Sequence, residues 1–279
     1  GIVGESGSGK SVTSSSIIRL LPPRTGKIVG GSIEFEGKDV LALSKKELND
    51  FRGKDIAVIF QDPMTSLDPV FKIGKQMTEM IMAHQNVTKD EAWKMAVEAL
   101  SKVGIPEPEK RMNSYPYELS GGMCQRVIIA MAVCCKPKLI IADEPTTALD
   151  VTVQAQVLEL LKELQRDMDT AILLITHNLG VVWEMFDKVM VMYAGNTVEF
   201  TDTKTLYSNP RHPYTWGLLD SMPKLSDESK GELKTIPGTP PDLRLTGKCP
   251  MVLPYVQMNC PPDLSANTMC FHSPKSIYQ

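Results

Sequence analysis

The residues with the clearest chemical potential form a glycine-rich stretch near the start of the sequence, Gly4-Glu5-Ser6-Gly7-Ser8-Gly9-Lys10-Ser11. Its spacing matches G-x-x-x-x-G-K-[ST], in which the glycines let the backbone curl so that successive N–H groups point at phosphate oxygens. Lys10 is expected to reach the β- and γ-phosphates, and the Ser11 hydroxyl to coordinate Mg²⁺. Residues 2–3 resemble the end of a strand, and residues 11–21 can form the helix whose positive end faces the anion. The stretch predicts a site for a nucleoside triphosphate with magnesium.

A second group of candidates ends an apolar run, Leu139-Ile140-Ile141-Ala142-Asp143-Glu144. A buried strand here delivers two carboxylates to its C-terminal edge, where α/β proteins bind ligands. We expect Asp143 to orient the Mg²⁺ shell and Glu144 to accept a proton from an attacking water. By itself, such a run is equally typical of a strand-to-turn boundary. Together with the glycine-rich stretch, it predicts a P-loop nucleotide hydrolase.

Short apolar runs and amphipathic segments predict the elements that position these residues. Four runs without polar alternation are typical of strands buried in a parallel sheet: residues 55–60, 139–142, 171–176 and 188–193. Residues 154–168 carry an apolar stripe at helical spacing, and Thr88 with Glu91 forms a capping box that opens another helix, which Gly104 ends. Strands that alternate with helices predict an α/β fold.

Composition excludes several classes of protein. The 279 residues carry 30 Lys and Arg against 33 Asp and Glu, a net charge of −3, which argues against nucleic acid as a partner. The longest apolar run, residues 127–135, is about half of what a membrane span requires. Six cysteines without a visible signal peptide favour reduced thiols in the cytoplasm. Because the sequence opens inside a strand-to-loop junction without Met, we expect a segment to be missing upstream.

A third stretch, Leu119-Ser120-Gly121-Gly122-Met123-Cys124-Gln125-Arg126, resembles the signature of ABC-type ATPases. Ser120 lies 110 residues after Lys10, and the order of the motifs fits the family. Ser120 and the two glycines are expected to open a helix running to about residue 135, a second helix N-terminus suited to an anion. The resemblance implies that residues 119–123 contact the γ-phosphate held by a partner's P-loop, so that two ATPs lie between two subunits.

The resemblance also implies the other residues around the nucleotide. The ATP-binding residues are Gly4, Glu5, Ser6, Gly7, Ser8, Gly9, Lys10, Ser11 and Val12. The magnesium ligands are Ser11, Gln61 and Asp143. The catalytic residues are Glu144, His177 and Gln61. Here Gln61 is the Q-loop glutamine, His177 is the switch histidine that steadies the γ-phosphate, and Asp150 belongs to the D-loop.

Longer strings resemble the ATP-binding subunits of oligopeptide, dipeptide and nickel importers. They are residues 61–69, 113–118, 145–154, 209–217 and 236–243. The resemblance implies an ATP-hydrolysing subunit that energises peptide import, peripheral on the cytoplasmic face of the cell membrane. Its implied partners are a second ABC ATPase, identical or different, two transmembrane permeases and an extracytoplasmic solute-binding protein.

Three alternatives accompany this hypothesis. The same type of subunit can serve an importer of nickel or another small solute, because the pocket that selects cargo lies on other subunits. A non-transport ABC ATPase is a second alternative, but the 110 residues between Lys10 and Ser120 leave no room for the coiled coil of DNA-repair types. A catalytically silent partner subunit is the third, and the presence of Glu144 and His177 argues against it.

The predicted organisation has three parts. Residues 1–65 and 136–200 form the P-loop ATPase core, with its first strands missing and with no adenine-stacking aromatic that can be named. Residues 66–135 form an inserted helical subdomain that carries the signature. Residues 201–279, rich in proline, form an irregular C-terminal extension of the peptide-importer type.

The cysteines invite two further expectations. The importer branch often carries four cysteines in its extension, associated in some members with an iron–sulfur cluster, whereas this chain offers Cys249, Cys260 and Cys270, with His272 as a substitute ligand. Three thiolates leave one iron of a four-iron cluster without a cysteine, so free thiols are the favoured interpretation. Cys124 stands where the branch usually has Arg, and we expect a small effect on phosphate binding.

Overall fold

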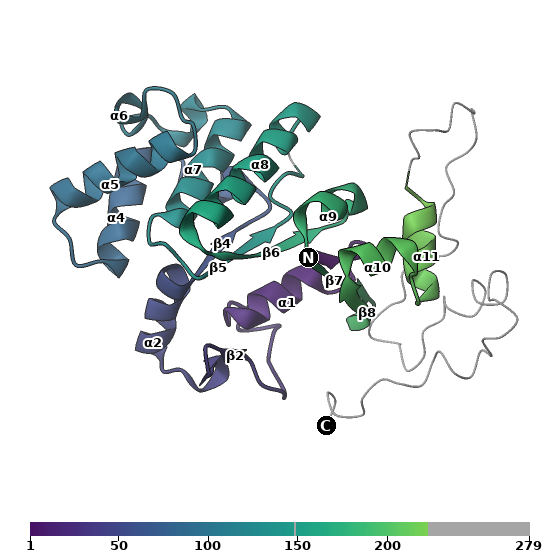
Figure 1. Ribbon diagram of the computed structural model, residues 1–279. Coiled ribbons are helices and arrows are strands. Elements are labelled where there is room, and N and C mark those ends of the chain that lie inside the picture. Colours follow the sequence, from purple (N-terminus) through teal and green to yellow (C-terminus); the bar gives the residue numbers. More distant parts are fainter. Residues whose placement is uncertain (148, 223–279) are drawn as a thin grey trace, which may run out of the picture. The chain divides into compact units, whose positions relative to one another are not determined.

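The computed structural model describes residues 1–147 and 149–222, shown in Figure 1. They form two compact units, one made of Gly1–Ser32 with the described residues from Ile175 onward, the other of Ile33–Leu174. Strand β6 (Ala171–Thr176) runs from the second unit into the first. This division follows contacts, whereas the predicted boundaries at residues 65, 135 and 200 follow the change from strands to helices; those boundaries stay a prediction.

The main sheet has the strand order β4-β5-β6-β1-β7-β8. Besides β6, its strands are β1 (Ile2–Val3), β4 (Ile56–Ile59), β5 (Leu139–Asp143), β7 (Lys188–Tyr193) and β8 (Asn196–Asp202). β4 pairs with β5, and β1 pairs with β6 and β7, all in parallel, while β8 pairs with β7 antiparallel. The four apolar runs are confirmed as strands. The sheet is mixed, not parallel throughout, because the turn after Tyr193 returns the chain along the same edge.

In the first unit, four helices accompany β1, β7 and β8. They are α1 (Lys10–Ile17), α9 (Leu179–Met185), α10 (Thr203–Ser208) and α11 (Pro213–Asp220). Their core gathers side chains from β7, α9, α10 and α11, among them Val189, Val191, Val182, Leu206 and Tyr214. Residues 203–208 and 213–220 are helical, whereas the proline-rich composition of this region predicted irregular chain. Proline does not exclude a helix here, because Pro213 is the first residue of α11. At that position a backbone N–H would have no partner within the helix, so its absence removes no hydrogen bond.

The second unit carries most of the helices. The longer ones are α2 (Lys45–Asp50), α4 (Ile73–His84), α5 (Lys89–Lys102), α7 (Gly121–Val133) and α8 (Val151–Met168). The shorter elements are α3 (Pro63–Ser66), α6 (Pro108–Arg111), η1 (Val40–Ala42), η2 (Phe51–Asp55), η3 (Pro116–Glu118) and the hairpin strands β2 (Glu34–Phe35) and β3 (Lys38–Asp39). The capping box that opens α5 is confirmed, since the Thr88 hydroxyl accepts from Glu91 N–H and the Glu91 carboxylate accepts from Thr88 N–H.

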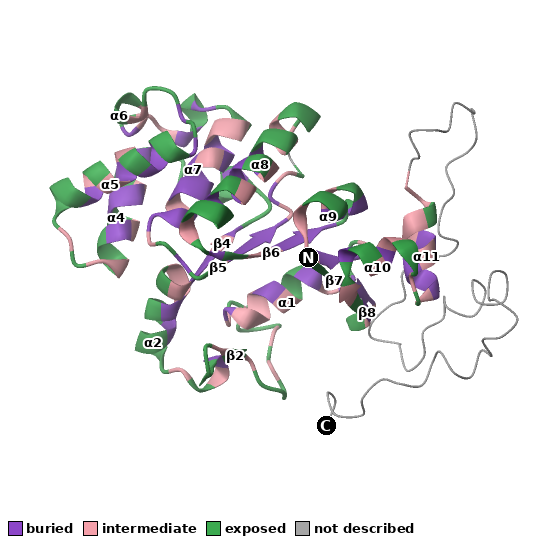
Figure 2. Ribbon diagram, viewed as in Figure 1, coloured by how far each residue is buried: buried purple, intermediate pink, exposed green. Residues whose placement is uncertain are grey.

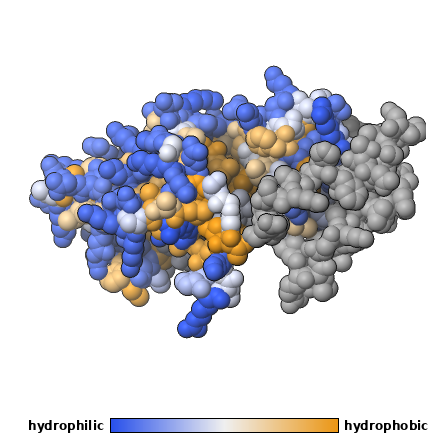
Figure 3. Space-filling model, turned by 90° about the horizontal axis from the view of Figure 1, so that it is seen from below, coloured by the Kyte–Doolittle hydropathy of each residue, from blue (hydrophilic) through white to orange (hydrophobic). Residues whose placement is uncertain are grey.

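Burial in the second unit follows the pattern expected for a sheet covered by helices. Strands β4 and β5 are almost wholly buried, and α4, α5 and α7 each turn a buried side inward (Figure 2). The face drawn in Figure 3 is mainly hydrophilic, with smaller areas of hydrophobic residues. Within the described residues, no helix combines the length and apolar character needed to cross a bilayer.

Candidate functional site

The phosphate loop occupies residues 4–9, between the end of β1 and the start of α1. Gly4 lies so close to β7 that a Cβ there would be 2.2 Å from the Met192 carbonyl oxygen. Gly9, with φ of +101°, precedes α1 without any side chain capping the helix. The first N–H groups of α1 therefore have no side-chain acceptor, as an anion site at a helix N-terminus requires.

Lys10 organises this loop. Its side chain is buried, with 5% of its surface exposed, and Nζ donates to Gly4 O at 2.7 Å and to Glu5 O at 3.0 Å. A buried ammonium needs such acceptors, so the loop closes around it. The buried Ser8 hydroxyl has no hydrogen-bond partner among the described residues. A cationic group and an unsatisfied hydroxyl within one loop fit a phosphate chain as ligand.

His177 leaves the strand next to the phosphate loop. β1 and β6 pair in parallel with Val3 opposite Thr176, so Gly4 and His177 emerge at the same edge of the sheet. The turn is fixed locally because Thr176 Oγ1 accepts from Asn178 N–H at 3.0 Å, and Asn178 Oδ1 caps α9. His177 is exposed at this edge. Its position agrees with the predicted switch role, which stays a prediction.

In the second unit, Gln61 and Glu144 are brought together by the pairing of β4 with β5. Ile59 lies opposite Ala142, so the two residues leave neighbouring strands at the same edge. Gln61 Nε2 donates to Glu144 Oε2 at 3.1 Å, and Thr147 Oγ1 donates to the same oxygen at 3.0 Å. Glu144 has φ of +46°, an uncommon conformation for a residue with a side chain. Such conformations cluster at functional sites.

Asp143 is the last residue of β5 and is 9% exposed. Its carboxylate is thus held by the strand, whereas Glu144 follows the strand and is only half-buried. Asp143 and Glu144 have different predicted roles, and the structure gives them different surroundings. Carboxylate oxygens are suitable ligands for Mg²⁺.

The signature begins α7, as predicted. Ser120 is the N-cap residue, and its Oγ accepts from Met123 N–H at 3.3 Å. Gly122 lies against α8, where a Cβ would be 2.9 Å from Val153 Cγ1. Asp150 of the predicted D-loop caps α8 by accepting from Val153 N–H at 3.0 Å. The N-termini of α7 and α8 are therefore in contact, side by side (Figure 1).

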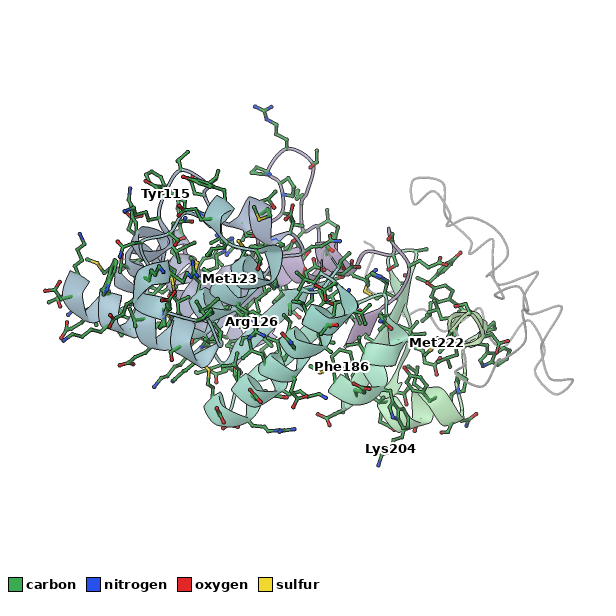
Figure 4. All side chains as sticks on the ribbon, turned by 90° about the horizontal axis from the view of Figure 1, so that it is seen from above. Tyr115, Met123, Arg126, Phe186, Lys204 and Met222 are labelled. Carbon is green, nitrogen blue, oxygen red and sulfur yellow. The ribbon has the colours of Figure 1, made fainter. Side chains whose placement is uncertain are left out.

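Arg126 supports this arrangement and was not singled out from the sequence. On α7 (Figure 4), it donates from Nη1 to Val103 O at 2.6 Å and from Nη2 to Gln156 Oε1 at 3.1 Å. It thereby connects the C-terminal end of α5, α7 and α8. The preference of Arg for backbone carbonyls at helix C-termini is the only sequence signal that could have indicated this role.

Cys124 points into the core beside the start of α7. Its side chain is fully buried, and its Sγ donates to Pro116 O at 3.4 Å. The fourth residue of α7 therefore faces the core, and the small effect of this position on phosphate binding stays a prediction. Burial raises the pKa of Cys124, and it raises the pKa of the Cys134 thiol to about 12. Both behave as small apolar core residues.

The cysteines predicted as cluster ligands, Cys249, Cys260 and Cys270, lie outside the described residues. Within residues 1–147 and 149–222, no group of three or more His, Cys, Asp and Glu side chains is placed to hold a metal ion. Val12, predicted among the ATP-binding residues, is exposed on the first turn of α1 next to Ser11.

These features define a class of protein: a P-loop ATPase of α/β fold, with a signature helix in its helical region. The family model described as ABC transporter matches residues 1–147, and the model described as oligopeptide/dipeptide transporter, C-terminal region, matches residues 198–251. The chain belongs to the ABC transporter family of ATP-binding proteins.

Curated relatives cover most of the chain. The oligopeptide transport ATP-binding protein OppD of Bacillus subtilis is 60% identical over 242 residues, 87% of this chain and 68% of the relative. The dipeptide transport ATP-binding protein DppD of the same species is 54% identical, over 87% of this chain and 72% of the relative. OppD of Salmonella typhimurium is 51% identical, over 98% of this chain and 79% of the relative.

Solved structures support the fold. A dimeric ATP-binding cassette bound to ADP and Pi after hydrolysis is 28% identical with a TM-score of 0.62, over 72% of this chain and 84% of that one. The cbiO1 protein of Clostridium perfringens, part of an ABC transporter complex, is 28% identical with a TM-score of 0.63. The match covers 75% of this chain and 78% of that one. The predicted family, the P-loop ATPase fold and ATP as ligand are thereby confirmed.

Proposed function

We propose that this chain hydrolyses ATP to energise the import of oligopeptides or dipeptides. One observation carries the proposal: a single chain matches both the ABC transporter family and the C-terminal region of oligopeptide/dipeptide transporters. The names of the relatives, which are oligopeptide and dipeptide transport proteins, favour peptides over the nickel alternative.

The phosphate loop is the first part of the proposed mechanism. The loop N–H groups and the N-terminus of α1 bind the triphosphate, and Lys10 neutralises its charge. Lys10 Nζ already lies within the loop, on the carbonyls of Gly4 and Glu5. Its positive charge therefore lies inside the loop that is proposed to receive the triphosphate.

Magnesium fits the residues assigned to it. The Ser11 hydroxyl, the Gln61 amide oxygen and the Asp143 carboxylate are oxygen donors of the kind that Mg²⁺ prefers. When bound with ATP, the ion supplies charge neutralisation of the phosphate oxygens. Gln61 and Asp143 follow or end β4 and β5 in one unit, Ser11 starts α1 in the other, and a shared ion is part of the proposal.

Glu144 is assigned as the base that takes a proton from the attacking water. Its Oε2 accepts two hydrogen bonds, from Gln61 and from Thr147, which fix its orientation. Gln61 therefore holds the base in addition to its proposed role at the metal. His177 is assigned to the γ-phosphate, as a donor that stabilises charge developing there.

The signature and the partners complete the proposal. Ser120 and the start of α7 of one subunit cover the nucleotide of a second ABC ATPase subunit, and the pair works with two permeases and an extracytoplasmic solute-binding protein. The dimeric cassette among the similar structures supports such pairing. The proposal includes a peripheral place on the cytoplasmic face of the membrane, and the names of the relatives, which are transport ATP-binding proteins, support it.

The test uses the full-length subunit in a transporter reconstituted into proteoliposomes. Glu144→Gln should lower ATP turnover and uptake of a labelled tetrapeptide together, roughly 10²- to 10⁴-fold, because the general base is lost. Binding of ATP should persist. The control is Glu163→Gln, an exposed position on α8, which should leave turnover and uptake unchanged.

Two results would count against the proposal. Full turnover in Glu144→Gln would remove Glu144 as the base. Uptake of ⁶³Ni²⁺ without uptake of the tetrapeptide, in the unaltered transporter, would replace the peptide assignment by the nickel alternative.

A further inference from the structure

We propose that Tyr214, on helix α11 of the C-terminal region, is a positioning residue for the phosphate loop. The Glu5 N–H donates to the Tyr214 hydroxyl oxygen at 3.0 Å, although the two residues are 209 positions apart. Both belong to the same compact unit. The inference rests on the proposed function, because it assigns the Tyr214–Glu5 hydrogen bond to the orientation of a loop that binds ATP.

The contact falls on a peptide group that also holds Lys10. The carbonyl of Gly4 and the N–H of Glu5 belong to one planar peptide unit. Lys10 Nζ donates to that carbonyl at 2.7 Å, and Tyr214 accepts from that N–H at 3.0 Å. The plane is therefore held at both ends, so its rotation would move the acceptor of the Lys10 ammonium. Tyr214 thus acts on the phosphate-binding lysine through one peptide unit.

The Tyr214 ring is held in place by its surroundings. It is 7% exposed, and its centroid is 4.5 Å from that of Tyr193, which ends β7. Burial raises the pKa of the Tyr214 hydroxyl, so the group stays neutral at physiological pH. Its oxygen can then accept from Glu5, and the rigid ring leaves that oxygen little freedom to move.

Helix α11 is anchored by Glu199 on strand β8. This carboxylate, 9% exposed, accepts from Arg211 N–H at 2.9 Å, His212 N–H at 3.1 Å and Thr215 Oγ1 at 2.6 Å. Three donors to a largely buried carboxylate make a strong local attachment, because charge-assisted hydrogen bonds are the stronger kind. The start of α11, and Tyr214 with it, is therefore fixed to the edge strand of the sheet.

This chain of contacts gives the C-terminal region an effect on the nucleotide site. The region described as oligopeptide/dipeptide transporter, C-terminal region, includes β8 from residue 198 and the whole of α11. Glu199 holds α11, α11 places Tyr214, and Tyr214 orients the Gly4–Glu5 peptide. The region therefore helps to set the loop geometry on which ATP affinity depends.

The experiment measures ATP hydrolysis by the reconstituted transporter that contains the full-length subunit. Tyr214→Phe keeps the ring and removes the acceptor. The KM for ATP should rise about 3- to 10-fold, because a part-buried N–H loses its partner, while kcat stays within about twofold. The matched control is Tyr207→Phe, since the Tyr207 hydroxyl donates to Leu179 O in the same unit and does not touch the loop. Its KM should stay within about twofold of the original.

A second variant tests the anchor. Glu199→Gln should raise the KM for ATP when Tyr214 is present, because the amide nitrogen cannot accept one of the three donors. Added to Tyr214→Phe, it should raise KM by less than about twofold more, because both act along one route. Fully multiplicative effects would contradict the proposed route.

The outcomes separate this inference from the proposed function. Absence of ATP hydrolysis in the unaltered transporter and in Tyr207→Phe would contradict the proposed function. Hydrolysis with an unchanged KM in Tyr214→Phe would overturn this inference alone. If Tyr214→Phe does not assemble, hydrogen exchange of the unaltered transporter decides: the Glu5 amide should be protected, and exchange at the rate of an unstructured peptide would overturn the inference.

Discussion

At the scale of single residues, the two signature glycines have different surroundings. A Cβ at Gly122 would be 2.9 Å from Val153 Cγ1, tighter than atoms normally approach. At Gly121 the nearest atom, Leu149 Cδ2, would be 4.0 Å away, an ordinary contact. Gly122 therefore lets α7 pack closely on α8, and a methyl group there would force Val153 or a helix to shift, independently of any nucleotide. Gly121 has room for a methyl group.

This difference predicts unequal stabilities. Gly122→Ala should lower the free energy of unfolding by about 1–3 kcal/mol, the usual cost of inserting a methyl group into packed structure. Gly121→Ala should change it by less than about 0.5 kcal/mol, since Ala is also the better helix former. Thermal unfolding of the full-length variants measures both. Adding Val153→Ala should restore much of the loss in Gly122→Ala, and equal stability of the two single variants would contradict the packing argument.

Residue types and spacing predicted the chemistry at this scale but not all of the geometry. Lys10, Asp143 and Glu144 could be assigned because a phosphate loop and a carboxylate-ending strand need those types at those places. The hydrogen bond between Gln61 and Glu144 could not be foreseen, because it follows from the register of β4 against β5. Tyr214 belongs to residues 209–217, which indicated the family resemblance but no role for this side chain.

At the scale of elements, α11 has a cap that depends on pH. His212 precedes the helix, and its Nδ1 accepts from Tyr214 N–H at 3.1 Å, which requires a neutral imidazole. Burial lowers the pKa of His212 below its ordinary value of 6.5, although the nearby Glu199 carboxylate opposes the shift. The cap is therefore intact near neutral pH.

The lowered pKa sets the sign of a pH effect on stability. Below about pH 6.5 the unfolded chain binds a proton at His212 that the folded chain does not, so the stabilising contribution is full above pH 6.5 and declines as pH falls through the folded pKa. Asn caps a helix without titrating. His212→Asn should therefore lose less stability between pH 7 and pH 5 than the original protein, by chemical denaturation at each pH. An identical pH dependence would show that His212 does not cap α11 in this way.

Local signals explain which elements were predicted. The strands buried in the middle of the sheet lack polar alternation, which is typical of buried strands. The capping box formed by Thr88 and Glu91 predicts the start of α5. β8 was not predicted, because an edge strand exposed on one side has no continuous apolar run. α10 and α11 were not predicted, because the proline-rich composition of this region is typical of loops. The local signals for these two helices are their capping residues, Asp202 and His212.

At the scale of the whole molecule, the predicted ATP residues are divided between two units. The phosphate loop and His177 belong to one, and Gln61, Asp143, Glu144 and the signature belong to the other. The fold class could be predicted because strands and helices alternate along the chain. The division into these units could not be predicted, because its boundary falls within β6. The residue pattern of a strand does not change where such a boundary crosses it.

The most direct test of the account is the binding of MgATP to the full-length subunit in its assembled complex, measured by isothermal titration calorimetry. The original protein and Lys94→Ala, an exposed control on α5, should bind equally. Lys10→Ala should bind at least about tenfold more weakly, because a charged donor to the phosphates is lost. Equal affinity in Lys10→Ala, or no heat of binding in the original protein at millimolar MgATP, would contradict the account.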